Sequence, residues 1–472
     1  PLARSMLLAV CTALLAALLG SALAILVSRT DLPGRRVLRI ILALPLAVPS
    51  YVGATAVLAA FGPGALLSGI PRLEGFWGAL IVLALLSYPY VYLPVLGRMS
   101  TTAPVLEDAA RQLGSGPIRT VVRVVLPQLR PAIGAGSLLV FLYVLSDFGA
   151  VSLLRYDTVT RAIFSARLFD RSTALTLGLI LGVLALLVIA VERSLAARKP
   201  TVTGEPGRGI RYPLGAARWP AVAGVAAVVG IALAAPVVVF VTWIGRGSAT
   251  VGAGFGGLGD GLGFLMRPAW NSTAISLVTG VLAVVVLLPL AYVASRRRSA
   301  LTDAAGAIVT SVFALPGLVV ALAVVFWAIQ APAPLAWLYQ SYPLLVLGYL
   351  LHFGAQSLRS SQAAVDAVPS RYDDAARTLG VDARRRFVAI ELPLLTPGLV
   401  AGGGLVMLST LKELPATLLL APIGFETLAT QIWGAATDGF YAEVGVTSLV
   451  LITVSAVLTW LFVVRPQLRG ST

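Results

Sequence analysis

Two acidic side chains lie inside long apolar stretches of the sequence, where an ionised group is costly and usually functional. Asp147 and Glu413 are 266 residues apart (147 to 413), and each follows a proline that begins its apolar run, Pro131 or Pro397. Lys412 adjoins Glu413, although neighbouring residues on a helix do not face each other. Paired carboxylates beside a central path would attract a cation, so we expect Asp147, Lys412 and Glu413 to line a translocation path. The alternative is that each acid caps or bonds a neighbouring helix end.

Other residue patterns that would indicate catalysis are absent from the sequence. It holds no Gly-x-x-x-x-Gly-Lys-Ser/Thr run for nucleotide phosphates, no Gly-x-Ser-x-Gly and no His-Glu-x-x-His. One histidine, His352, and one cysteine, Cys11, cannot by themselves form a metal site or an internal disulfide. We therefore expect a protein that is not an enzyme, with no cofactor and no tightly bound metal in this chain. Any ATP hydrolysis must come from a separate subunit.

A polar stretch that occurs twice between apolar runs is the clearest pattern in the chain. It reads Asp-Ala-Ala-Arg-x-Leu-Gly and closes on Leu-Pro, at residues 108–127 and again at 374–393. Each copy predicts a short helix, a bend at Gly114 or Gly380 where a left-handed turn suits glycine, and a second short helix. The paired alanines leave a helix face of little bulk, which another protein can approach closely. Two ordinary amphipathic surface loops are the alternative, and the shared register disfavours it.

This repeated pattern resembles the cytoplasmic coupling loop, or Glu-Ala-Ala loop, of ATP-binding-cassette importer permeases, with aspartate in place of the first glutamate. The resemblance implies that each loop docks into a groove on an ATPase subunit, which is a helix-in-groove contact. The residues that it assigns to ATPase coupling are Glu107, Asp108, Ala109, Ala110, Gly114, Pro127, Asp373, Asp374, Ala375, Ala376, Gly380 and Pro393.

The composition is that of an integral membrane protein. The 472 residues are 58% hydrophobic and 12% charged, and the net charge of +15 comes mostly from arginines in short loops. Apolar runs of about 20 residues predict membrane helices, five in the first half and six in the second. These runs lie at 5–27, 38–61, 76–97, 131–153, 174–194, 219–244, 273–295, 305–329, 341–357, 397–420 and 446–464. The chain starts at Pro1 without a methionine, so we expect an upstream piece and six plus six helices in the full protein.

The placement of arginines predicts the orientation of these helices. Most of the 35 basic residues fall in loops on the side that carries both repeated polar stretches, which puts that side in the cytoplasm. The two halves run the same way through the membrane, so we predict an all-α, polytopic transmembrane bundle of two parallel repeats. The expected domains are a first permease half at 1–194, a cytoplasmic linker at 195–217 and a second permease half at 218–472.

Further runs are similar to those of fused ferric-iron permeases. They are Ser146 to Ala150, Leu154 to Thr158, Lys412 to Thr417, Arg29 to Arg36 and Pro49 to Val52. The resemblance implies a type I ABC importer permease fold in the cell (inner or plasma) membrane. It also implies two copies of an ABC ATPase that carry ATP and Mg, and an extracytoplasmic substrate-binding protein. Ferric iron is the implied cargo, although permeases for thiamine, polyamines and phosphonates share much of the pattern.

Two arginines, Arg155 and Arg161, follow the first of the two acids on the outer side. They are candidates for docking acidic residues of the binding protein, and a solvated outer loop is the alternative. Membrane lipid is a further expected partner, and nucleic acid is not. Among other classes of function, a secondary transporter or channel leaves the repeated polar stretches unexplained, and an intramembrane enzyme lacks a catalytic constellation.

Overall fold

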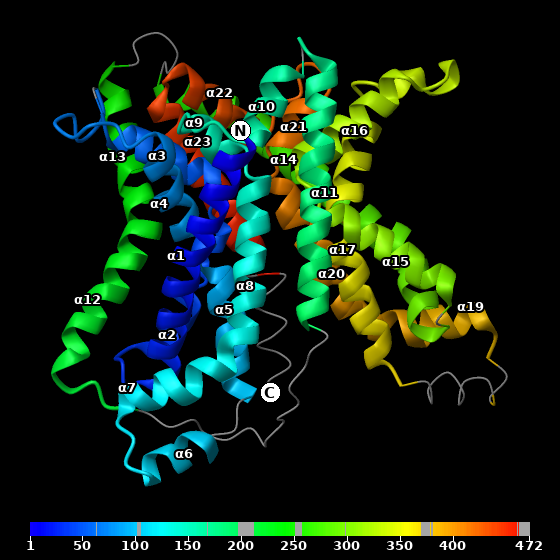
Figure 1. The fold of residues 1–472 in the computed structure, drawn as a ribbon. Helices are drawn as coiled ribbons and strands as arrows, with labels where there is room; N and C mark the ends of the chain where they lie inside the picture. The colour runs from blue at the N-terminus through cyan, green and yellow to red at the C-terminus, as the bar shows by residue number, and fades with distance from the viewer. Residues whose placement is uncertain are drawn as a thin grey trace. The chain divides into compact units, whose positions relative to one another are not determined.

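The chain is helical along almost all of its described length (Figure 1). The computed structural model describes residues 1–62, 64–101, 105–167, 169–196, 212–250, 257–297, 299–369, 378, 381–459 and 461. Within these ranges the helices are joined by turns, and the only extended pairings are two isolated bridges. The prediction of an all-α protein is confirmed.

Contacts divide the chain into two compact units. The first is Pro1–Gly247 with Gly439–Gly445, and the second is Ser248–Asp438 with Val446–Thr472. Helical elements of the first unit are α1 (Leu2–Arg29), α2 (Arg35–Ile41), η1 (Leu44–Ala47), α3 (Ser50–Ala60), α4 (Gly75–Ser87), α5 (Pro89–Thr101), α6 (Val105–Gln112), α7 (Pro117–Thr120), η2 (Val121–Val125), α8 (Leu126–Ser146), α9 (Gly149–Leu153), α10 (Val159–Ala166), α11 (Arg171–Ala196), η3 (Gly215–Ala217), α12 (Arg218–Val229), η4 (Gly230–Ala234) and α13 (Ala235–Thr250).

The second unit repeats the order of the first from α14 onward. Its elements are α14 (Gly257–Arg296), α15 (Ala300–Phe313), α16 (Gly317–Ile329), η5 (Ala333–Leu338), α17 (Tyr342–Ala367), α19 (Ala383–Arg386), η6 (Phe387–Glu391), α20 (Leu392–Leu411), α21 (Pro415–Leu420), α22 (Leu428–Asp438) and α23 (Tyr441–Thr459). Thus α14 corresponds to α1, α16 to α3, α17 to α4 and α5 together, α20 to α8, and α21 to α9. The repeat seen in the sequence is therefore a repeat of structure.

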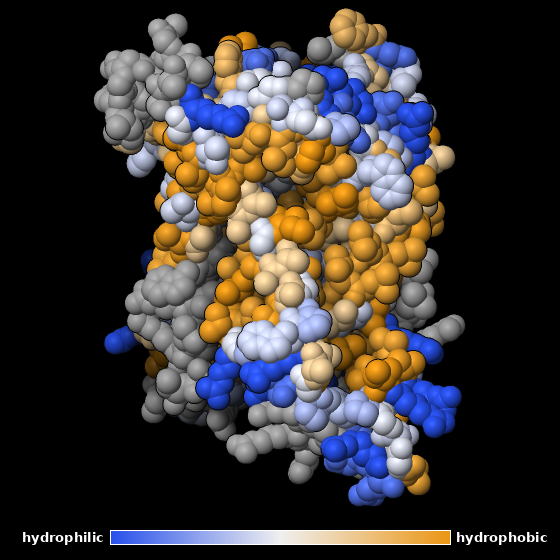
Figure 2. All heavy atoms as spheres, turned by 90° about the vertical axis from the view of Figure 1, so that its left-hand side faces the viewer, coloured by the Kyte–Doolittle hydropathy of each residue, from blue (hydrophilic) through white to orange (hydrophobic). Residues whose placement is uncertain are grey.

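Membrane-length helices account for the expected apolar runs. Within the described residues, 8 helices are long and apolar enough to cross a membrane, or up to 10 when each of two bent pairs counts as one span. Helix α17 covers the remaining expected run at 341–357. Figure 2 shows a broad band of apolar side chains on one face, with hydrophilic side chains gathered above and below it. This is the surface that a hydrocarbon layer requires.

Two of the expected helices are broken rather than continuous. The run expected at 38–61 bends by 89° between the segments Arg35–Ala47 and Ser50–Ala60, and the run expected at 305–329 bends by 109° before Gly317. Pro49 and Pro316 stand immediately before the second segment of each pair. Proline has no N–H for a helix and disfavours helical geometry in the residue before it. The expectation of single helices here was wrong because hydropathy does not register this effect.

Three π-helical segments have a shared cause in the sequence. They are η2, η6 and η4, and each ends two residues before a proline: Pro127, Pro393 or Pro236. A proline within a helix cannot bond the carbonyl four residues earlier and clashes with it. Widening the preceding turn to π geometry relieves this clash without ending the helix. The residues from Pro117 to Ser146 therefore form one span.

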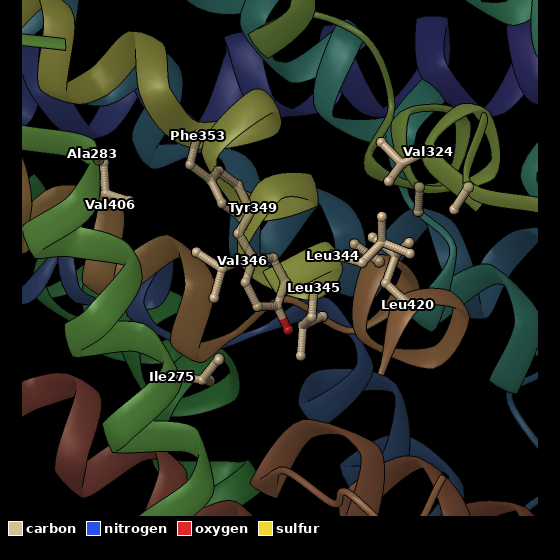
Figure 3. Close-up of a cluster of buried hydrophobic side chains, with 13 residues drawn as sticks. Ile275, Ala283, Val324, Leu344, Leu345, Val346, Tyr349, Phe353, Val406 and Leu420 are labelled. Atoms are coloured by element: carbon tan, nitrogen blue, oxygen red, sulfur yellow. The ribbon is translucent and has the colours of Figure 1, made fainter. Parts of the chain in front are cut away.

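An apolar core in the second unit fixes α17 against its neighbours. Figure 3 shows Tyr349, Val346 and Phe353 of α17 among side chains from α14, α16, α20 and α21. The Tyr349 hydroxyl lies 2.6 Å from the Thr417 hydroxyl of α21, so the one polar atom of this ring is satisfied. Between membrane helices, close van der Waals packing and interhelical hydrogen bonds of this kind are what stabilise the association. Residues next to this core on α17 are consequently held in place.

The segment 218–247 packs in the first unit, although the sequence places it in the second half. The Trp243 indole donates a 2.8 Å hydrogen bond to the Ala59 carbonyl, and its ring lies 5.1 Å from that of Tyr441. These contacts tie α13 to α3 within one unit. The expected domain boundaries at 194 and 217 describe the sequence repeat, and they stay a prediction.

Gly136 permits the close approach of α8 to α5. A Cβ at this position would lie 2.6 Å from the Val91 Cα and 2.7 Å from the Tyr90 carbonyl oxygen, whereas nothing lies within 4 Å at Gly134 of the same helix. We expect Gly136→Ala to lower the free energy of unfolding by about 1–3 kcal/mol through overpacking. Gly134→Ala should leave it unchanged or slightly raised, because alanine favours helix. Thermal unfolding in detergent compares the two, and equal melting temperatures would contradict this packing.

Candidate functional site

The first copy of the repeated polar stretch folds as the sequence predicts. Helix α6 ends at Gln112, and Gly114 adopts φ +79°, the left-handed turn that ends many helices. The Ser115 amide closes the turn on the Ala110 carbonyl at 3.0 Å. Helix α7 follows from Pro117, so the prediction of a glycine bend between two helices is confirmed for this copy. The second helix is not short, because it continues as one span to Ser146.

The acids of α6 point in different directions. Asp108 and Ala109 are exposed and Ala110 is half-buried, so the small-residue face remains accessible to a partner. Glu107 instead is only 1% exposed. It was grouped with the ATPase-coupling residues, but a side chain buried within its own chain is suited to anchoring α6. Glu107 and Asp108 are adjacent acids, so residue type alone does not indicate which of them is buried.

Glu107 forms a buried ion pair with the end of α1. The Arg29 guanidinium nitrogen Nη2 lies 2.9 Å from Glu107 Oε1, and these side chains are 5% and 1% exposed. The pair lacks hydrogen-bond alignment at these two atoms, so its attraction is mainly ionic. The Tyr212 hydroxyl donates to Glu107 Oε2 at 3.4 Å. Burial, and then the adjacent Glu107 carboxylate, raise the pKa of Tyr212, which keeps this phenol protonated as a donor.

The described end of the linker binds to the same place. The Tyr212 amide donates to the Arg29 carbonyl at 2.8 Å, and the Leu214 amide donates to Asp31 Oδ1 at 2.9 Å. The Arg111 guanidinium lies over the Tyr212 ring at 5.9 Å, within reach of a cation–π contact. Helix α1, helix α6 and the linker end therefore meet around one buried ion pair. The rest of the expected linker, 197–211, lies outside the described residues.

Exposed apolar side chains on this loop were missed by the sequence reasoning. Leu106 is 50% exposed, Leu113 86% and Ile118 81%. They lie on α6, on the turn after it and on α7. Apolar groups that gather on an otherwise polar loop indicate a protein interaction site. One feature of the sequence could have indicated this site: Leu113 is part of the repeated polar pattern and lies outside the long apolar runs.

Most of the second copy cannot be compared in the same way. Asp373, Asp374, Ala375, Ala376 and Gly380 lie outside the described residues. Pro393 stands at the start of α20, as Pro127 does in α8.

The arginine that corresponds to Arg29 in the repeat is Arg296, at the end of α14. Its Nη2 donates to the Val368 carbonyl at 3.0 Å. Val368 follows the end of α17, shortly before the second copy. In both halves, then, the arginine at this position holds the backbone or side chain next to the polar stretch.

The two acids at membrane depth occupy equivalent places. Asp147 Oδ1 accepts a 3.2 Å hydrogen bond from the Val151 amide in the first turn of α9, and Glu413 Oε1 accepts a 3.1 Å bond from the Ala416 amide of α21. Such bonds are those of a helix cap, the alternative weighed for these acids. Lys412 is the C-cap residue of α20 and is half-buried. Their part in a translocation path stays a prediction.

The two outer arginines differ in how firmly they are paired. Arg161 Nη1 lies 2.6 Å from Asp157 Oδ1, and Arg4 Nη1 lies 2.9 Å from the other oxygen of the same carboxylate. Arg155 has φ +56° and is 67% exposed, with a 4.0 Å contact to Glu74. Exposed pairs of this kind contribute little to stability. Both side chains are accessible, and their docking role stays a prediction.

No group of three or more histidine, cysteine, aspartate or glutamate side chains that could hold a metal occurs among the described residues.

Comparison with known proteins identifies a family. The family of binding-protein-dependent transport system inner membrane components matches residues 10–199 and 288–465. The chain is 30% identical to the Fe(3+)-transport system permease protein FbpB 2 of Haemophilus influenzae, over 98% of this chain and 88% of that protein. It is 25% identical to the probable ABC transporter permease protein y4fN of Sinorhizobium fredii, over 89% and 79% of the two chains.

A shorter match covers less than half of the chain. The molybdenum transport system permease protein ModB of Mycobacterium tuberculosis is 34% identical over 207 residues, which are 41% of this chain and 77% of that protein.

Removing one partner of the Arg29–Glu107 pair should leave the other charge buried and unpaired. We expect Glu107→Ala or Arg29→Ala to lower the free energy of unfolding by about 3–5 kcal/mol, and the double change to leucine to cost less than either. Asp108→Ala, at the exposed neighbour, should cost little. Thermal unfolding measures the loss of stability, and limited proteolysis of α6 measures whether this helix is still anchored. Equal effects of Glu107→Ala and Asp108→Ala would refute the anchoring role.

Proposed function

The chain belongs to the family of binding-protein-dependent transport system inner membrane components, and we propose that it carries ferric iron across the membrane. It is a multi-pass, inner-membrane permease component of an ABC importer. The cargo rests on one observation, the match to a ferric-iron permease along 98% of this chain. The experiment that tests it is ferric uptake with the cognate binding protein, described below.

The membrane acids favour a cation over an oxyanion. Asp147 and Glu413 stand at equivalent positions in the two halves, each at a break between helices. Carboxylates repel molybdate-like anions and attract hard cations, for which oxygen is a preferred ligand. The match to a molybdenum permease covers 41% of this chain, and it supports the permease class rather than an oxyanion cargo. Thiamine, polyamine and phosphonate remain alternatives that the uptake experiment distinguishes.

Energy for transport would come from two copies of a separate ABC ATPase. We propose that they dock at residues 104–127 and 370–393, on the cytoplasmic side, and that ATP and Mg bind to these partners. Support for the first site comes from the accessible alanines and from the exposed Leu113 and Ile118 of the same loop. An amphipathic helix in a groove is a recurring mode of protein recognition.

The buried ion pair would transmit motion of a docked ATPase to a membrane helix. Force applied to α6 would reach α1 through Glu107 and Arg29, because both side chains are buried and 2.9 Å apart. Movement of the ATPases on nucleotide binding would then displace the cytoplasmic end of a membrane helix. Displacement of packed helices is a common form of switching between states.

An extracytoplasmic binding protein would deliver the cargo at the opposite side. Arg155 and Arg161 are accessible there, and acidic residues on the delivering protein would complement them. The 67% exposure of the Arg155 side chain makes it the better candidate of the two. The orientation follows from the arginine distribution in the loops.

A bulky residue on the small face of α6 should prevent docking. We expect Ala109→Trp to abolish co-purification with the ATPase and substrate-stimulated ATP hydrolysis, because tryptophan cannot enter a groove shaped for alanine. Ile423→Trp is the matched control, since Ile423 is 86% exposed and lies far along the chain from either polar stretch. Pull-down and ATPase assays on the purified complex decide the matter. If the Ala109→Trp variant still co-purifies with the ATPase and still shows substrate-stimulated ATP hydrolysis, α6 is not part of the interface.

Ferric transport itself can be tested with the reconstituted importer. Vesicles that hold the permease and its ATPase should accumulate iron from the ferric-loaded binding protein only when ATP is present. The same vesicles should not accumulate molybdate, sulfate, thiamine or a polyamine. Radiolabelled uptake provides the measurement. ATP-dependent uptake of one of those compounds in place of iron would overturn the proposed cargo while leaving the permease class intact.

A further inference from the structure

Two membrane spans of the first unit are tied together on the side that carries the first polar stretch. One is Leu2–Arg29, which is α1, and the other is Gly215–Arg246, which begins with η3 and α12. Residues 212–214, the linker end, join them through the bonds to the Arg29 carbonyl and the Asp31 carboxylate, at 2.8 and 2.9 Å. An isolated parallel bridge pairs residues 30 and 212 at the same place. The linker end is therefore fixed to the end of α1.

The linker end also joins the second span without an intervening loop. Leu214 immediately precedes Gly215, where that span begins. The Leu214 carbonyl accepts a 3.0 Å hydrogen bond from the Ala217 amide in η3, and α12 follows directly from Arg218. A displacement of the linker end would therefore displace the beginning of this span.

Helix α6 contacts the linker end through two charged side chains. Glu107 and Arg111 are four residues apart on α6, so they share one face of the helix. The Arg111 guanidinium lies 5.9 Å from the centre of the Tyr212 ring, and Glu107 Oε2 lies 3.4 Å from the Tyr212 hydroxyl. Tyr212 is only 6% exposed. Figure 1 shows α6 at the same end of the first unit as the beginning of α12.

Tyr212 thus contacts α6 through its side chain and α1 through its backbone. The backbone bonds have the short distances of well-formed hydrogen bonds, which hold the linker end in place. The buried ring is in contact with the face of α6, and packed side chains leave little free space for independent movement. A shift of α6 at a contact of this kind is passed on as a shift of the packed helices.

We infer that Tyr212 is a positioning residue through which the first polar stretch moves the span Gly215–Arg246 together with α1. The inference rests on the proposed function, because it takes α6 to be the place where an ATPase docks. It adds a second membrane span to the route through the Glu107–Arg29 ion pair. By sequence, the added span precedes the repeat of the second half. One docked ATPase would therefore move helices from both halves of the sequence.

A flexible insertion tests whether the linker end must be joined directly to the span. Four residues, Gly-Ser-Gly-Ser, between Leu214 and Gly215 retain the contacts of Tyr212 and let the span move independently, because such sequences are flexible. The same four residues within 197–211, ahead of Tyr212, are the matched control. They lengthen the linker by the same amount and leave Tyr212 directly joined to the span.

The measurement is the amount of substrate transported per ATP hydrolysed, in vesicles that hold the permease and its ATPase. We expect the insertion after Leu214 to lower this ratio by about threefold or more. The insertion within 197–211 should leave the ratio unchanged. The ratio can be measured with whichever substrate the importer carries, so the result does not depend on the cargo being iron.

Substitutions at Tyr212 test the contact with α6 without changing the length of the chain. Tyr212→Ala removes the ring, and we expect it to lower transport per ATP as the insertion after Leu214 does. Tyr212→Phe retains the ring beside Arg111 and loses only the long hydroxyl contact, so it should retain most of the unsubstituted ratio. Tyr339→Ala is the matched control, since Tyr339 is 43% exposed. Melting temperatures and co-purification with the ATPase show that each variant is folded and docked.

The outcomes separate the role of Tyr212 from the proposed function. An unchanged ratio after the insertion behind Leu214, or in Tyr212→Ala, rejects this role and leaves the permease function standing. Equal losses from the two insertions also reject it, because the length of the linker alone would then explain the effect. If the unsubstituted importer shows no ATP-dependent uptake of any substrate, the proposed function itself is wrong.

Discussion

Backbone polar groups inside a membrane must be satisfied within the protein, and this constraint explains where the functional residues lie. Hydrocarbon offers no hydrogen bonds, so every broken helix needs side chains or other helix ends to complete it. In each half the breaks are brought together, and an acid stands where they meet. The residues that complete these helix ends are therefore acidic groups within otherwise apolar segments.

The repeat keeps the framework and varies the chemistry. Helix order, π-helical turns and acids recur in both halves. What differs is the set of side chains around each acid: serine and tyrosine in the first half, glycine and histidine in the second. A duplicated framework permits this, because one copy can hold the fold while the other changes. The exposed loop that is proposed to bind the ATPase shows the opposite behaviour, since its pattern is nearly identical in the two copies.

The positions of the helices, the repeat and the first polar loop could be predicted from the sequence. The length of each apolar run indicates a helix, and the constant spacing between matching residues of the two halves indicates the repeat. The breaks at Pro49 and Pro316 were not predicted, because a hydropathy average over about 20 residues does not show where the helix axis bends. The burial of Glu107 was also hidden, since its partner Arg29 lies 78 positions earlier in the chain (29 to 107). Long-range pairing of this kind depends on the tertiary fold, which no local pattern encodes.

The linker end has a consequence for how such a protein can be encoded. Residues 212–214 bind to Arg29 and Asp31, and the helix that follows them packs in the first unit. A polypeptide beginning at the linker would therefore bring its own attachment to the preceding half. Separate genes for the two halves could then yield products that recognise each other without a peptide bond between them. Fusion into one chain fixes their one-to-one ratio.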